Sequence, residues 1–216
     1  MNTILKITAV VLLASGFLLT TSAASADVSY NVGFASEYYY RGVLQKDSSA
    51  SGGVDYENNG FYAGTWAADV GDGVEIDGYF GYGIETESGI TASLGFTGYY
   101  YTGEFDDTYE ELNLNLGYGM FGLEYSVGEW EGFGAEQDYD FLAGTVTFEN
   151  GIYGTYGTWG DDFDGEYIEL GWGTTISEID FGVAVILSSD ELSDQTDSDG
   201  DATESEALVF TISKTF

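Results

Sequence analysis

The feature that most constrains the fold of this chain is a strict period-two alternation across residues 111–128, ELNLNLGYGMFGLEYSVG. Leucine, valine or an aromatic residue occupies every second position, with Glu, Asn, Ser or Gly between, and the pattern resumes after Gly119-Met120. Successive side chains of a strand point to opposite faces, so the pattern predicts two strands, each with one apolar and one polar face. Such a hairpin fits either a soluble sandwich with its apolar face buried or a membrane barrel with its apolar face outside.

Similar segments recur along the chain and are separated by turn-forming residues. We predict twelve strands, at residues 28–42, 49–57, 60–69, 74–85, 90–102, 108–118, 121–128, 138–148, 151–159, 166–175, 179–188 and 205–216. Most have about the length of the roughly 9–11 residues with which a tilted strand crosses a bilayer. The chain contains no proline, which suits strands that must donate hydrogen bonds on both edges.

The connections between these segments alternate in length. Short connections such as Asn58-Asn59-Gly60 and Asn150-Gly151 alternate with longer acidic stretches such as GEFDDT and the run 188–204. Short turns at one end and long loops at the other are typical of outer-membrane barrels. We therefore predict an all-β fold, a closed antiparallel up-and-down transmembrane β-barrel of about 12 strands.

The two ends of the chain support export and insertion. Residues 1–26 combine an early lysine, an apolar run and the triplet Ala24-Ser25-Ala26, which predicts a cleaved secretory signal peptide before a barrel domain at 27–216. In the last segment, Phe210, Ile212 and the terminal Phe216 share one face, interrupted by Lys214. An amphipathic strand with a terminal aromatic residue resembles the signal that hands bacterial barrels to their assembly machinery. We expect a bacterial outer-membrane location, with membrane lipid and this machinery as partners.

The charge balance excludes several functions. Beyond residue 26 the chain keeps three basic residues against 38 acids, so nucleic acid and anionic lipid would be repelled. Without histidine or cysteine, neither Ser-His activation nor a thiolate nucleophile is available, and carboxylates this numerous make no pair distinctive. We expect no enzymatic activity and no cofactor. The run Asp197–Asp201 is similar to a calcium loop, but Gln195 stands where the first ligand belongs, so we expect no metal site.

If the apolar faces meet lipid, the polar faces line a hydrated interior. The predicted channel-lining residues are Glu37, Arg41, Asp55, Glu75, Asp77, Glu111, Glu124, Asp140, Glu169 and Asp180. We also expect interfacial aromatic girdles from Tyr38, Tyr39, Tyr40, Tyr99, Tyr100, Tyr101, Trp66, Trp130 and Trp159. Rings of acids favour cations in a pore, so small solutes or cations are the expected cargo; the alternative is an acidic surface with no transport role.

Arg41 is the only arginine in the chain. It could narrow the lumen or bind a carboxylate-bearing solute. The alternative is a structural ion pair with Glu37 or another nearby acid. The same choice applies to the whole lumen, which could be open or plugged; a plugged lumen would make the protein a non-conducting structural or surface-interaction barrel.

The N-terminal part of the predicted barrel resembles the TorF family of porins. The matching residues are Tyr40, Arg41, Gly42 and Gln45, then Gly52, Gly53, Asp55 and Tyr56, then Gly60 through Trp66. Glu75, Ile76 and Asp77 and the closing Ile-Ser-Lys-Thr-Phe also fit, whereas residues 100–200 match more loosely. The resemblance implies an outer-membrane barrel with porin function and identifies no substrate.

Overall fold

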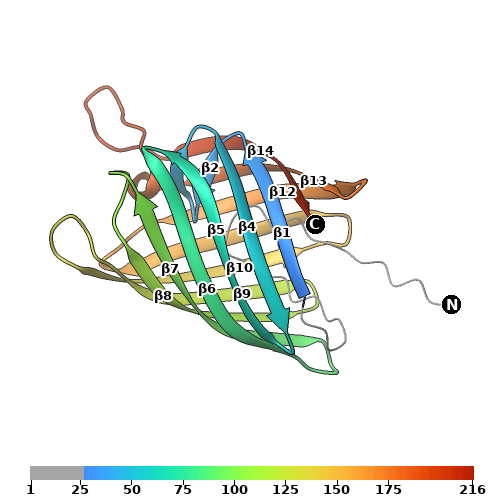
Figure 1. The fold of residues 1–216 in the computed structure, drawn as a ribbon. Helices are drawn as coiled ribbons and strands as arrows, with labels where there is room; N and C mark the ends of the chain where they lie inside the picture. The colour runs from blue at the N-terminus through green and yellow to red at the C-terminus, as the bar shows by residue number, and fades with distance from the viewer. Residues whose placement is uncertain (1–26) are drawn as a thin grey trace.

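The computed structural model describes residues 27–216, which form almost entirely β-structure (Figure 1). The predicted signal peptide, residues 1–26, lies outside the described residues. The strands are β1 Asp27–Ala35, β2 Tyr38–Tyr40, β3 Val43–Lys46, β4 Ser49–Asn58, β5 Phe61–Gly71, β6 Gly73–Glu85, β7 Ile90–Thr102, β8 Tyr109–Tyr118, β9 Phe121–Trp130, β10 Gln137–Thr147, β11 Ile152–Asp161, β12 Glu166–Ile176, β13 Ile179–Ser188 and β14 Ser205–Thr215, with a 3₁₀ turn η1 at Asp190–Leu192. Within this described part, no helix is long and apolar enough to span a membrane.

Twelve of these strands close into one antiparallel barrel, as predicted. Each strand pairs with its sequence neighbours, except that β1 pairs with β14 on one side and with β4 on the other. The β1–β14 seam places Phe34 opposite Ile212. Phe216 extends this seam, because its backbone N–H donates to the Tyr30 carbonyl at 2.8 Å. The ring therefore closes with every strand paired on both edges.

The two ends of the barrel differ as the loop lengths predict. One end, here called the short-turn end, carries tight turns such as Asn59-Gly60, both at positive φ, and the start of β1. The opposite end, here called the long-loop end, carries the connections 36–48, 103–108, 131–136, 162–165 and 189–204. The single exception at the long-loop end is the tight turn between β5 and β6 at Asp72. The β2–β3 hairpin and the cavity described below lie toward the long-loop end.

The apolar side chains of the barrel strands face outward. Leu94 and Leu170 are 60% and 58% exposed, whereas Glu75 and Glu111 on the polar faces are 2% and 1% exposed. A band of leucine, isoleucine, valine and phenylalanine continues around the outer wall through Phe34, Phe80, Leu114, Leu123, Val185 and Leu208. Exposed apolar surface on this scale marks an interaction with lipid or with another apolar partner. The arrangement is the reverse of a soluble barrel.

One predicted strand was wrong in its extent. The segment predicted at 28–42 ends at Ala35, and Tyr38–Tyr40 pairs instead with Val43–Lys46 as a separate two-stranded hairpin, β2–β3. The hairpin folds into the barrel from the long-loop end (Figure 1). Its side chains are apolar and aromatic enough to continue the strand pattern, so alternation alone did not reveal the break. The hairpin fills part of the lumen.

Candidate functional site

The tip of the β2–β3 hairpin is a two-residue turn formed by Arg41 and Gly42. Both have positive φ, 46° and 87°, which is the geometry of the type I′ turns that join short hairpins. Two wall side chains cap the tip: Trp159 Nε1 donates to the Arg41 carbonyl at 3.1 Å, and Ser188 Oγ donates to the Gly42 carbonyl at 2.6 Å. Because an arginine in this region of φ carries a conformational cost, the contacts of its side chain must hold it there.

The Arg41 guanidinium reaches two glutamates on the barrel wall. Its NH1 and NH2 groups donate to both oxygens of Glu111 at 2.8 and 3.0 Å, and NH2 also donates to Glu124 at 2.5 Å. The guanidinium lies over the Phe141 ring, 4.2 Å from its centroid. A planar fork that binds one carboxylate through two hydrogen bonds while stacking on a ring is geometry that lysine cannot reproduce.

Glu111 is the centre of this network. Besides Arg41, it accepts hydrogen bonds from the Tyr99 hydroxyl at 2.7 Å, the Tyr139 hydroxyl at 3.1 Å and the Asn113 amide at 2.6 Å. A carboxylate that is 1% exposed would be costly to bury alone, but here four side chains donate hydrogen bonds to it. The structural alternative for Arg41 is therefore observed, with Glu111 and Glu124 as partners in place of Glu37.

The hairpin is also held by β5, β6 and β7, the strands that precede β8 in the wall. The Tyr38 hydroxyl donates to Glu75 on β6 at 2.6 Å, and the Tyr40 hydroxyl donates to Tyr99 on β7 at 2.8 Å. Tyr38 packs edge-on against Trp66 of β5. The hairpin thus contacts the neighbouring strands β5 to β9 along one stretch of the wall, and β11 and β13 on the facing stretch, so it crosses the lumen.

The predicted lining residues mostly occupy the inner face. Asp55, Glu75, Asp77, Glu111, Glu124, Glu169 and Asp180 lie on inward positions of their strands, and Glu37 lies in the link between β1 and β2. Several are held by tyrosines: Asp55 accepts from Tyr79, and Glu169 from Tyr153. Asp77 Oδ1 is buried with no hydrogen-bond partner among residues 27–216. The lumen is strongly acidic, and Arg41 is itself paired with two of these acids.

Asp140 was assigned to the wrong face. On β10 the buried inward residues are Tyr139, Phe141 and Ala143, so Asp140 points outward beside Gly160. The inner face of β10 is aromatic because Phe141 stacks on Arg41 and Tyr139 donates to Glu111. Asp140 is therefore an exception to the expectation that strand acids face inward, because aromatic side chains that contact the hairpin and Glu111 occupy the inward positions of β10.

The predicted interfacial aromatic girdles were also wrong for most of their residues, which face the interior of the barrel and not the membrane interface. Tyr100 is 44% exposed on the outer wall. The other eight residues pack inside the barrel: Tyr38, Tyr39, Tyr40, Tyr99, Tyr101, Trp66, Trp130 and Trp159. In the run Tyr99–Tyr101 the sequence shows no alternation, and only strand register decides which ring meets the lumen. The inward-facing rings surround the hairpin and fill the half of the lumen that is nearer the long-loop end.

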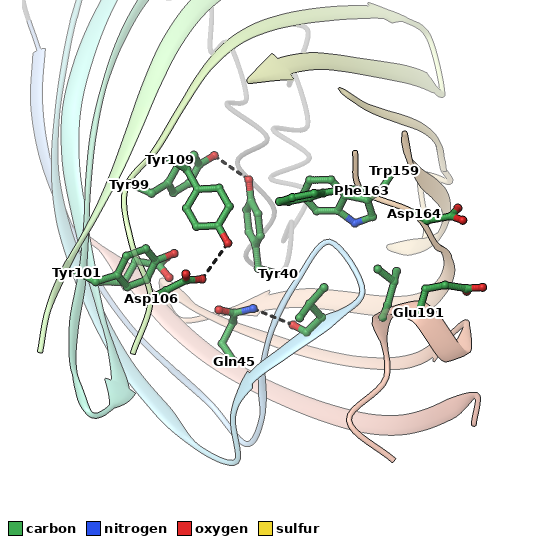
Figure 2. Close-up of a pocket in the computed structure, with 13 residues that line it drawn as sticks. Tyr40, Gln45, Tyr99, Tyr101, Asp106, Tyr109, Trp159, Phe163, Asp164 and Glu191 are labelled. Carbon is green, nitrogen blue, oxygen red and sulfur yellow. Dashed lines mark hydrogen bonds between the residues drawn. The ribbon is translucent and has the colours of Figure 1, made fainter. Parts of the chain in front are cut away.

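A cavity of about 310 Å³ remains between the hairpin and the loops at the long-loop end (Figure 2). Tyrosine, tryptophan and phenylalanine provide six of its thirteen lining residues, and carboxylates from β6 and the loops provide four. Tyr109 lies in its wall and donates to Asp106 at 2.8 Å, as the dashed line in Figure 2 shows. The sequence contained these residues, but their convergence from separate strands and loops could not be read from local pattern.

The long loop before β14 is ordered by its own backbone. Asp197 accepts hydrogen bonds from the N–H groups of Asp199 and Asp201 at 2.8 and 3.1 Å. These bonds hold the pKa of Asp197 below its usual range. Across residues 27–216, no group of three or more acidic side chains is arranged to hold a metal ion.

The residues predicted as an assembly signal lie on the outer face of β14. Phe210, Ile212 and Phe216 are 54%, 41% and 67% exposed. Lys214 shares this face, where its ammonium lies 3.3 Å from Glu178 and 5.1 Å from the centroid of the Phe216 ring. The outer face of β14 is thus apolar apart from Glu206 at the start of the strand and Lys214, which is paired near the short-turn end.

Comparison with known proteins gives a family match and distant structural likenesses. The family model "Bacterial protein of unknown function (Gcw_chp)" matches residues 20–216, and no curated protein matches in sequence. Among solved structures, the outer membrane protein OpdK of Pseudomonas aeruginosa has a TM-score of 0.39 at 14% identity, covering 80% of this chain and 58% of its own. OccD3 (OpdP) of Pseudomonas aeruginosa scores 0.43 at 15% identity, with 86% and 60% covered, and OccAB2 of Acinetobacter baumannii scores 0.44 at 9%, with 90% and 65% covered.

The chain thus matches about three fifths of the length of these solved structures. The identities and TM-scores are too low to carry an inference about substrate or mechanism.

Proposed function

Since the chain belongs to the Gcw_chp family of bacterial proteins of unknown function, we propose a function from the geometry of the barrel itself. The protein is an outer-membrane, porin-like channel for passive diffusion of small hydrophilic solutes, and it prefers cations. The short-turn end faces the periplasm and the long-loop end faces the external medium. The similarity of residues 40–66 to the TorF porins supports the same class of protein.

The observation that carries this proposal is the inside-out distribution of side chains. Leucines and phenylalanines are exposed on the outer wall, and seven acids occupy inward strand positions, two of them paired with Arg41. A bilayer provides the apolar surroundings that such an outer wall needs. Carboxylates at a lumen attract cations and repel anions, with a strength that falls as salt screens them.

Conductance of the refolded protein in a planar bilayer tests the proposal. In a potassium chloride gradient, the reversal potential should favour potassium. Glu169→Gln, which removes a lumen charge, should reduce this preference, whereas Glu87→Gln in a turn at the short-turn end should leave it unchanged. A channel that passes chloride in preference to potassium would contradict the cation assignment.

A non-conducting barrel is the second candidate, and the hairpin is the observation that favours it. Tyr38 anchors the hairpin to Glu75 on β6, and Trp159 on β11 binds its tip from the facing wall, so the chain crosses the lumen. Osmotic swelling of vesicles with small sugars separates the two candidates. If the wild-type protein allows neither sugar entry into vesicles nor ion conductance, and the Arg41→Met variant allows both, the hairpin is a plug.

A further inference from the structure

The cavity at the long-loop end has walls suited to a positively charged guest. Six aromatic rings line it, from Tyr40, Tyr99, Tyr101, Tyr109, Trp159 and Phe163. Figure 2 shows the Tyr40 and Tyr109 rings between the Tyr99–Tyr101 side of the cavity and the Trp159–Phe163 side. The negative faces of such rings attract cations, and cages of this kind recognise quaternary ammonium groups.

Two of these rings already contact a cation deeper in the barrel. The Arg41 guanidinium lies 4.9 Å from the Tyr40 centroid and 5.5 Å from the Trp159 centroid. The aromatic cluster extends from this contact up to Tyr109, which packs on Phe163 at 6.5 Å between centroids. The wall of the cavity thus continues an aromatic cluster that contacts the Arg41 guanidinium.

Glu75 adds a buried charge without a cationic partner. It lines the cavity and is 2% exposed, and its carboxylate accepts the Tyr38 hydroxyl. No ion pair within residues 27–216 includes Glu75. A buried carboxylate that lacks a counter-charge is stabilised when a cation binds beside it.

Asp106 is a second carboxylate, held in a fixed orientation on the same side of the cavity. Its oxygens accept hydrogen bonds from Trp130 Nε1 at 3.1 Å and from the Tyr109 hydroxyl at 2.8 Å. Figure 2 shows Asp106 beside Tyr101 and Tyr109. Among residues 27–216, no lysine or arginine lines the cavity. The charged side chains that line the cavity are all carboxylates, so they would repel an anionic ligand.

We infer that this cavity binds a small organic cation, an amine or quaternary ammonium group with an apolar body. The ammonium group lies near Glu75 and Asp106, and the apolar body packs on the rings. A volume of about 310 Å³ suits a compact ligand. The inference deepens the proposed cation preference by naming a class of cation, and it rests on the proposed function only for passage of the bound cation into the lumen.

Calorimetric titration of the refolded full-length barrel in detergent tests the site. The probe is benzylamine, with benzyl alcohol as its neutral isostere and benzoate as its anionic counterpart. We expect benzylamine to bind at least tenfold more tightly than either. Glu75→Gln and Asp106→Asn should each weaken benzylamine binding at least tenfold, whereas Glu110→Gln on the outer face of β8 should change it less than twofold.

Three results would overturn the inference: benzyl alcohol binding as tightly as the amine, wild-type affinity in both cavity variants, or no benzylamine binding at millimolar concentrations. Heat-dependent gel mobility of each variant verifies that its barrel is folded. Because binding is measured without a membrane, its failure is distinct from failure of the channel. A barrel that binds benzylamine but conducts nothing would refute the channel and leave this site standing.

Discussion

Replacement of Arg41 by methionine tests whether the buried ion pairs hold the hairpin inside the barrel. The change removes the hydrogen bonds to Glu111 and Glu124 and the ring contact with Phe141, and leaves two carboxylates without their cation. Loss of one partner of a buried pair costs about 3–5 kcal/mol. At about 1.4 kcal/mol per factor of ten, the displaced hairpin should become about 10²- to 10⁴-fold more populated.

The absence of native cysteine allows a single reporter thiol to follow this displacement. Ala143 is 5% exposed on the inner face of β10, within the cluster against which the hairpin packs. In an Ala143→Cys background, the rate of alkylation measures the population of open hairpin when closing is faster than reaction. Arg41→Met should raise that rate by the same two to four orders of magnitude.

Lys46→Met provides the matched control. Lys46 lies on the same hairpin and pairs with Asp69, but both side chains are partly exposed, at 25% and 49%. A pair of that kind contributes about 0–1 kcal/mol, so alkylation should rise less than about fivefold. Equal rates in the Arg41 and Lys46 variants would refute the reasoning. Adding Glu111→Gln to Arg41→Met should recover part of the loss, because one uncompensated carboxylate disappears.

Three further predictions concern the outer wall, the turn and the seam. Leu114→Arg should lower the free energy of unfolding in liposomes by about 2–4 kcal/mol because it places a charge in lipid, whereas Asn115→Arg on the inner face should cost less; the opposite order in urea titrations would refute the inside-out assignment. Gly42→Ala should raise the rate of alkylation of the reporter thiol at least tenfold, because the new Cβ would lie 2.7 Å from the Cβ of a tyrosine. Gly119→Ala should leave that rate unchanged, because no atom lies within 4 Å of its Cβ position. Deletion of Phe216 should reduce heat-modifiable barrel in isolated outer membranes more than Phe216→Ala, which keeps the backbone bonds to β1; equal losses would assign the role to the ring alone.

The sequence by itself determined the barrel. Alternation in segments such as 111–128, glycine and asparagine in the short turns, and acids in the long loops are local properties. They depend on the pleat of a strand and on the φ values that a turn requires, so they can be read without knowing any distant partner. The number of barrel strands, the two unlike ends and the apolar outer wall all follow from them.

Only the tertiary structure decided what fills the lumen. Arg41 binds Glu111, 70 residues away, and Trp159 caps the Arg41 carbonyl from 118 residues away. The same contacts turn Tyr139 and Phe141 inward and leave Asp140 outside. Hydrophobic alternation cannot encode such contacts, because a strand inside the barrel and a strand in its wall present similar patterns. The physical reason is that each depends on the closed register of the ring, which brings distant residues to the same depth.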